Sequence, residues 1–400
     1  MSEEDFSAVC STIEGEREFL NSVSQDIWCH PQLAYEEEHA HELLSGVLSN
    51  RGFQVQKGYV VPTAFRAEFQ SKADGGPVIA VLLEYDALPE IGHACGHNLI
   101  AEAGLAASLA IKAVMEADPE LVGKLVVLGT PAEEGAGGKV DLLRGGAFEG
   151  VDAAMMVHPC NYNTTSPPIL CLREINVDFK GKEVHAAATP WKGRNALDAA
   201  VAAYVNISLL RQHMKPTDMV HAIITKGGLV PNVIPAESRL EIYVRAATRI
   251  ELADLTERVL DCIRSGERAA GCTASIQCDM KGGNENLISN RVMAQLYDTY
   301  TKRLGIHPTD FSEEPELSSG STDMGNVSHA VPSIQPMYNI NTESLFHTTE
   351  FQVASGDPKA QDPTLNVAKA MATIALKLMR CPETLAKAKK EFEDAIAKGF

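Results

Sequence analysis

A cysteine and a histidine lie two positions apart in the segment His93–Asn98, which reads HACGHN. A thiolate and an imidazole are both good ligands for a borderline-soft metal such as zinc, so Cys95 and His97 are candidate ligands. The segment comes ten residues after an apolar run at 78–83 and directly before a long Ala/Leu-rich stretch. Taken alone, a reduced cysteine and a helix-capping histidine explain it equally well.

Two adjacent carboxylates occur in the segment PAEEGAGG, at Glu133 and Glu134. If both point into one site, they repel each other. A bound metal ion removes this conflict, because one carboxylate can bind the metal while the other accepts a proton from water. A solvated acidic turn is the simpler interpretation of this segment by itself. The following Gly138-Lys139 pair suggests a phosphate-binding loop, but Val140 stands where such a loop needs Ser or Thr.

A third candidate ligand, His158, ends the apolar stretch 153–157. Like 78–83 and 124–129, this stretch is short and continuously apolar, which is typical of a parallel strand that is covered on both faces. Because the carboxyl ends of parallel strands meet at one edge of a sheet, all three segments deliver their polar residues to the same edge. Convergence of the three segments predicts a metal site there.

The elements that position these residues alternate strand and helix, which predicts an α/β domain with a mostly parallel sheet. After residue 171 the pattern changes to strand, helix, two strands, helix and strand, which is typical of a ferredoxin-like α+β domain. We therefore expect a metal-binding domain at 1–171 and 287–400, interrupted by an inserted domain at 172–286. The predicted helices are 12–29, 36–51, 101–114, 195–211, 250–265, 290–303, 364–379 and 382–398. The remaining predicted strands are 174–179, 220–225, 239–245, 272–278 and 333–340.

The composition is that of a globular chain, with 45% hydrophobic and 22% charged residues. A formal charge of −18 disfavours nucleic acid and anionic membranes as partners, because both require clustered Lys and Arg. The first twenty residues lack the basic and apolar regions of a secretory signal, and nine scattered cysteines are typical of reduced thiols. We therefore expect a cytoplasmic protein.

The motifs DALP, HACGH, PAEEGAGGK, MMVHP, GKEVHAA, PNVIPA and GSTDMGN occur in an order that resembles the aminoacylase/carboxypeptidase family of metallopeptidases, the M20 family. The similarity covers nearly the whole chain. It is closest to the branch whose members cleave indoleacetyl-amino acids and β-alanyl-lysine-type dipeptides. The resemblance implies a catalytic α/β domain and a ferredoxin-like lid through which two subunits form a homodimer.

The resemblance also implies a role for single residues. Glu133 becomes the general base, and His185 stabilises the oxyanion, often across a dimer interface. Asn232 and Arg245 are expected to contact the substrate, while Asp86 and Asn98 are expected to lie behind the ligands. Family members that cleave indoleacetyl conjugates carry Asp where this chain has Asn98, which affects how His97 is oriented. The implied metal ligands are Cys95, His97, Glu134, His158 and His347.

The expected activity is hydrolysis of a small dipeptide or N-acyl amino acid, with β-alanyl-lysine-type dipeptides as the first choice. One or two divalent ions per subunit would activate water, with zinc expected first and manganese or cobalt as alternatives. One rival is another amide reaction at the same site, on a natural product or in the direction of bond formation. The other rival is a non-catalytic relative that only binds metal.

Overall fold

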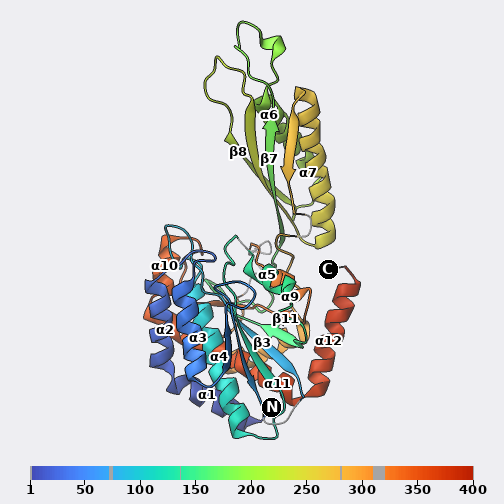
Figure 1. Cartoon of the computed structure of the whole chain (residues 1–400). Helices are drawn as coiled ribbons and strands as arrows, with labels where there is room; N and C mark the ends of the chain where they lie inside the picture. The colour runs from blue at the N-terminus through green and yellow to red at the C-terminus, as the bar shows by residue number, and fades with distance from the viewer. Residues whose placement is uncertain (1, 72–74, 136, 280–281, 310–319, 400) are drawn as a thin grey trace. The chain divides into compact units, whose positions relative to one another are not determined.

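The protein is described here by a computed structural model covering residues 2–71, 75–135, 137–279, 282–309 and 320–399 (Figure 1). The chain forms two compact units. Unit 1 combines Met1–Pro168 with Leu287–Lys398, and unit 2 comprises Ile169–Asn286 with the last two residues.

Unit 1 is built on a six-stranded sheet in the order β1-β2-β4-β3-β5-β11. Strand β3 runs parallel to β4 and β5, and β11 runs parallel to β5, whereas β2 pairs antiparallel with β1 and β4. This confirms the mostly parallel sheet expected from the apolar runs. The strands are β1 (Gln54–Lys57), β2 (Phe65–Gln70), β3 (Val78–Leu83), β4 (Lys124–Gly129), β5 (Ala153–Met155) and β11 (Ser333–Ile334).

Both faces of this sheet are buried. Along β3, Ile79 and Val81 belong to the larger core, whereas Ala80 and Leu82 belong to a second core on the opposite face. Helices therefore cover the sheet on two sides, as continuous apolar strands require. On the larger core lie α1 (Glu3–Gly15), α2 (Arg17–Cys29), α3 (Glu38–Asn50), α4 (His97–Ala117), α8 (Arg291–Arg303), α10 (Thr349–Ser355), α11 (Gln361–Arg380) and α12 (Pro382–Ala397). The second core is covered by α5 (Gly138–Arg144) and α9 (Met324–Ser328).

Helix α4 is the central helix of unit 1. It packs on β3, α1, α2 and α11. By length and apolar composition it could cross a membrane, but 89% of its most apolar window is buried inside the structure. Its apolar character is therefore explained by its position in the protein core.

Several predicted elements are divided in the structure. The helix expected at 12–29 is two helices that meet at Glu16, where φ is −100° and ψ is 3°. The strand expected at 333–340 is interrupted at Pro336, which has no N–H for a ladder bond, so β11 is followed by a separate β12 (Met337–Asn339). Strand β12 pairs with β6 (His158–Cys160), outside the main sheet. The strand expected at 153–157 accordingly ends at Met155.

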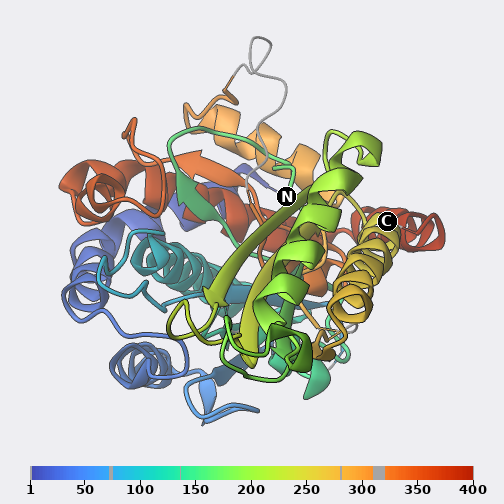
Figure 2. The ribbon, with the colours of Figure 1, turned by 90° about the horizontal axis from the view of Figure 1, so that it is seen from above.

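Unit 2 contains the predicted order of strand, helix, two strands, helix and strand. Its antiparallel sheet has the order β10-β7-β9-β8, and α6 and α7 pack side by side on it (Figure 2). A Cβ on Gly266 of α7 would come within 2.5 Å of the Ala199 carbonyl oxygen, so glycine permits this close helix contact. The elements are β7 (Cys171–Lys180), α6 (Ala196–Leu210), β8 (Met219–Lys226), β9 (Glu237–Ala246), α7 (Arg249–Ala270) and β10 (Thr273–Gln277).

Candidate metal centre

The loop after β3 brings Cys95 and His97 into the interior of unit 1. Between them, Gly96 has a φ of +77°, and a Cβ there would lie 2.6 Å from Cγ of Pro159. Only glycine fits this conformation without a clash. The turn lets both neighbouring side chains point inward, and the sulfur of Cys95 lies 3.4 Å from Nε2 of His158.

The ring of His97 is oriented by Asp86. Its Nδ1 lies 3.0 Å from Oδ1 of Asp86, while Oδ2 accepts the backbone N–H of Glu134 at 2.9 Å. A carboxylate only accepts, so Nδ1 carries a proton and Nε2 is the ring nitrogen left to face the centre. Within the described part of the chain, that Nε2 is buried and has no hydrogen-bond partner. Burial opposes a charged ring, but Asp86 and Cys95 outweigh it and raise the pKa of His97, so a metal that binds at Nε2 would displace a proton there.

The ring of His158 is also oriented by a hydrogen bond at Nδ1, but it is held neutral. Its Nδ1 donates to the carbonyl oxygen of Pro159 at 2.8 Å, which leaves Nε2 facing Cys95. Burial lowers the pKa of His158 to about 4, so the ring is neutral at pH 7. Neutral imidazole is the form that binds metal.

The turn after β4 carries both candidate glutamates. Ala132 has a φ of +60°, which is unfavourable for a residue with a Cβ, and its N–H donates to Oε1 of the buried Glu37 at 2.9 Å. A Cβ on Gly138 would lie 1.9 Å from the Pro131 carbonyl oxygen, so the turn is closely packed at its end as well. Its conformation is therefore imposed by tertiary contacts.

The two glutamates lie in different electrostatic surroundings. Burial, together with the carboxylates of Glu84 and Glu134, raises the pKa of Glu133. Burial also opposes ionisation of Glu134, but the imidazoles of His347 and His97 outweigh it and lower the pKa of that carboxyl. Glu134 is thus suited to be a permanent anion, and Glu133 to exchange a proton.

His347 completes the cluster from a distant part of the chain. Its φ is +64°, and its backbone N–H donates to the Ala94 carbonyl oxygen at 2.8 Å. Its Nε2 lies 3.3 Å from Oε1 of Glu134, and 51% of its side chain is exposed. His347 therefore lies at the solvent side of the cluster.

These side chains form overlapping sets whose ligand atoms all lie within 4.8 Å of one another. The sets share members, so they describe one centre with adjacent positions for cations. Thiolate, imidazole and carboxylate together suit a borderline-soft divalent ion. The residues therefore fit divalent metal. The sets are Cys95 with His97 and His158, Cys95 with Glu134 and His347, and His97 with Glu133 and Glu134.

Three buried residues beside the centre were not predicted as site residues. Nζ of Lys139 lies 2.5 Å from Oε1 of Glu84 and 2.6 Å from Oδ1 of Asp323. The sequence offered weak signals for them, because Glu84 directly follows the first apolar strand and Asp323 lies in the GSTDMGN motif. In the sequence, Lys139 belongs only to the incomplete phosphate-loop pattern.

Asn98 lies next to His97 in sequence, but its side chain has another role. Its Nδ2 donates to Oγ of Ser24 at 3.1 Å and to the Ser355 carbonyl oxygen at 3.0 Å. It thus fastens the start of α4 to α2 and α10. The side chain that hydrogen-bonds the His97 ring is Asp86.

The other predicted residues belong to unit 2. His185 is exposed, and its Nδ1 accepts the N–H groups of Ala187 and Ala188 at 3.2 and 3.3 Å. Asn232 lies beside this segment, because its carbonyl accepts the Ala186 N–H at 2.9 Å. Arg245 is half-buried on β9, opposite Met219 of β8.

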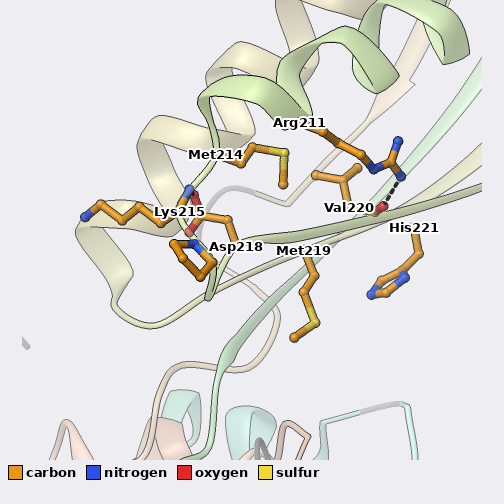
Figure 3. A pocket seen from close by; sticks show the side chains of 8 residues that line it. Arg211, Met214, Lys215, Asp218, Met219, Val220 and His221 are labelled. Carbon is orange, nitrogen blue, oxygen red and sulfur yellow. Dashed lines mark hydrogen bonds between the residues drawn. The ribbon is translucent and has the colours of Figure 1, made fainter. Parts of the chain in front are cut away.

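Unit 2 also has a cavity of about 440 Å³ between the end of α6 and the start of β8 (Figure 3). Arg211 lies on one side and donates to the Val220 carbonyl oxygen at 3.1 Å. The lining residues are Arg211, Met214, Lys215, Pro216, Asp218, Met219, Val220 and His221. None of them belongs to the ligand sets of unit 1.

Comparisons with known proteins agree with this architecture. Residues 172–270 match the peptidase dimerisation domain. The Xaa-Arg dipeptidase of Mus musculus is 45% identical over 95% of this chain and 90% of its own length. One of the subunits of the Escherichia coli p-aminobenzoyl-glutamate hydrolase is 32% identical over 73% of this chain and 63% of its own length.

A solved structure shares the fold. A dinuclear metal binding peptidase of the M20 family from Bacillus subtilis superposes with a TM-score of 0.66 at 19% identity, covering 91% of this chain and 99% of that one. The expected resemblance is thereby confirmed, and so is the expectation of an amide-hydrolysing enzyme. The chain belongs to the M20 family of metal-dependent peptidases and amidohydrolases.

Proposed function

We propose that this protein is a metallo-dipeptidase that removes a cationic C-terminal residue, Arg or Lys, from small dipeptides. One observation carries the proposal. Segments that follow β3, β4 and β5 bring a thiol, imidazoles and two glutamates together, in sets whose ligand atoms lie within 4.8 Å of one another. The choice of substrate draws on the 45% identity to a protein named Xaa-Arg dipeptidase. It also agrees with the β-alanyl-lysine-type dipeptides expected from the motifs.

A divalent ion held by Cys95, His97, Glu134, His158 and His347 would lower the pKa of a coordinated water and polarise the scissile carbonyl. Zinc suits this ligand set, with manganese or cobalt as alternatives, and the overlapping sets leave room for one or two ions. Glu133 accepts the proton of the attacking water and delivers it to the leaving amine. Its surroundings, which raise its pKa, favour the protonated form that makes the second transfer.

His185 is proposed to stabilise the oxyanion. Because its Nδ1 accepts two backbone N–H groups, the neutral ring carries its proton on Nε2, which is then an exposed hydrogen-bond donor. A donor aimed at a developing oxyanion contributes roughly a hundred- to a thousandfold in rate. Asn232 lies beside it and is proposed to contact the substrate, and Arg245 is proposed to bind its carboxylate.

We infer a homodimer through unit 2. Helix α6 exposes an apolar stripe, and β8, the outermost strand of the sheet, exposes Ile223 and Ile224. An exposed stripe beside an open strand edge favours a two-fold contact with a second copy. The stripe consists of Val201, Tyr204, Val205 and Leu209. We expect Val205→Glu combined with Ile223→Lys to give monomers in light scattering, whereas Ile250→Lys, at an exposed apolar position on α7, remains dimeric.

The protein is further proposed to act in the cytoplasm. All nine cysteines are free thiols, including the proposed ligand Cys95. A reducing compartment keeps such thiols available for metal.

The substrate proposal is tested with a matched panel on metal-loaded protein. We expect turnover of β-alanyl-arginine and β-alanyl-lysine, weaker turnover of β-alanyl-norleucine, and loss of activity on chelation with recovery on adding zinc or manganese. Preference for N-acetyl-arginine or p-aminobenzoyl-glutamate would instead assign the site to N-acyl amino acids. Bound metal without turnover of any of these amides would support a binding protein.

Mixed dimers test whether His185 acts across the interface. Glu133→Gln subunits and His185→Ala subunits are each expected to be nearly inactive. If His185 serves the partner's metal centre, half of the mixed dimers' sites are intact, and re-associated equal mixtures regain about a quarter of wild-type activity. No regain in demonstrably mixed dimers would place His185 within its own subunit's site.

A further inference from the structure

Lys139 is an unusual residue because its ammonium group is fully buried. It lies 2.5 Å from Oε1 of Glu84 and 2.6 Å from Oδ1 of Asp323, and its backbone N–H donates to Oδ2 of Asp323 at 2.8 Å. Glu84 and Asp323 are themselves fully buried. The ion group is therefore shielded from water, where charge interactions are strong and an unpaired charge is costly.

This ion group borders the metal centre. The free oxygen Oε2 of Glu84 lies 3.5 Å from Nε2 of His97. Carboxylate oxygens of Glu84, Glu133 and Asp323 lie within 4.8 Å of one another, a spacing that could hold a metal ion. Two of these three carboxylates already contact the ammonium group of Lys139.

We propose that Lys139 is an internal cation that takes the place of a metal ion among Glu84, Asp323 and Glu133. It thereby limits the number of divalent ions at the centre and holds the carboxylate of Glu133 free for proton transfer. Lys139 is thus a positioning residue, since it acts through its neighbours and not on the substrate. This inference rests on the proposed function only in taking Glu133 as the base.

The fold supports this role. Lys139 lies in the first turn of α5, which directly follows the turn that carries Glu133. Glu84 follows the last residue of β3, and Asp323 precedes α9. The ammonium group of Lys139 therefore links the end of β3 and the start of α9 to the turn that carries Glu133. A neutral residue here would leave adjacent buried carboxylates without a counter-charge.

The decisive variant is Lys139→Met, which keeps an unbranched side chain, one heavy atom shorter, and removes its charge. After equilibration with zinc and removal of free metal, we expect one more bound ion per subunit than in wild type, measured by elemental analysis. We expect kcat to fall about 10- to 100-fold with a much smaller change in KM. In the double variant Lys139→Met/Asp323→Asn, the extra ion should be lost and part of kcat restored.

The control is Lys369→Met. Lys369 is also a buried lysine, paired with Glu14, but it lies on α11 away from the ligand sets. We expect lower stability with wild-type metal content and kcat. A merely structural Lys139 would behave in the same way, and that result for Lys139→Met would overturn the proposal. Wild-type protein that binds no zinc would instead refute the proposed function.

If Lys139→Met does not fold, Asp323→Asn provides the test. With one carboxylate removed, the ammonium group is free to pair with Glu133, so kcat should fall at least about 10-fold while metal content stays at the wild-type value. Wild-type kcat in the folded variant would contradict the role of Lys139.

Discussion

Asp86 offers the sharpest test of how the metal centre is organised. Both of its oxygens are used, one by Nδ1 of His97 at 3.0 Å and the other by the N–H of Glu134 at 2.9 Å. The buried carboxylate of Asp86 thus orients both the ring of His97 and the backbone of Glu134. Asp86→Ala removes the acceptors of both donors and leaves Nδ1 of His97 buried without one.

The expected loss follows from these two contacts. Removing the carboxylate that orients a ligating histidine costs about 10- to 100-fold in metal affinity. This corresponds to about 1.4–2.7 kcal/mol of binding free energy. A buried donor left without an acceptor costs roughly 1–3 kcal/mol, so the metal-free protein also loses stability. Asp86→Asn keeps one acceptor but turns an N–H₂ group toward one of the donors, so we expect it to bind metal weakly as well.

The measurement is a zinc titration of the apoprotein in competition with a chromophoric chelator, together with urea unfolding. Asp152→Ala is the matched control, because Asp152 also accepts a backbone N–H, that of Val78 at 2.7 Å, and pairs with Lys389. It should lose stability and keep its zinc affinity. An Asp86→Ala protein that binds zinc within about twofold of wild type would show that Asp86 does not organise the centre.

Three further outcomes are expected. Glu133→Gln should lower kcat by about 10²- to 10⁴-fold with metal content unchanged, as measured by steady-state kinetics and elemental analysis; activity near wild type would remove Glu133 as the base. Glu37→Ala should destabilise the protein in urea, because Ala132 keeps a φ of +60° without its acceptor, and adding Ala132→Gly should recover roughly 1 kcal/mol; no recovery would show that the turn is not strained. Burial raises the pKa of Glu102 from 4.5 to about 7, so the native state favours the neutral acid. The resulting cost to stability is absent below pH 4.5, grows as pH rises and is complete above about 7, where it reaches about 3 kcal/mol. Glu102→Gln should therefore gain stability relative to wild type between pH 5 and pH 8, and a constant difference in unfolding free energy across this range would contradict the shift.

The sequence alone determined the parts of the fold that follow local patterns. The runs 78–83 and 124–129 match β3 and β4, because a strand buried on both faces must be continuously apolar. Parallel strands then brought Cys95 and Glu134 to one edge. The residue types of these two candidate ligands were already present in these segments.

Only the tertiary structure decided which distant residues join them. His347 reaches Glu134 through a backbone conformation that no local pattern predicts, held by the Ala94 carbonyl. The pairing of Lys139 with Glu84 and Asp323 could not be predicted from the sequence either. Glu84 lies 55 positions before Lys139, and Asp323 lies beyond unit 2 in the chain, so the three residues meet only in the core. The periodicity of apolar residues in the sequence indicates which face of a helix or strand is buried. Which charged residues pair depends instead on which elements pack together.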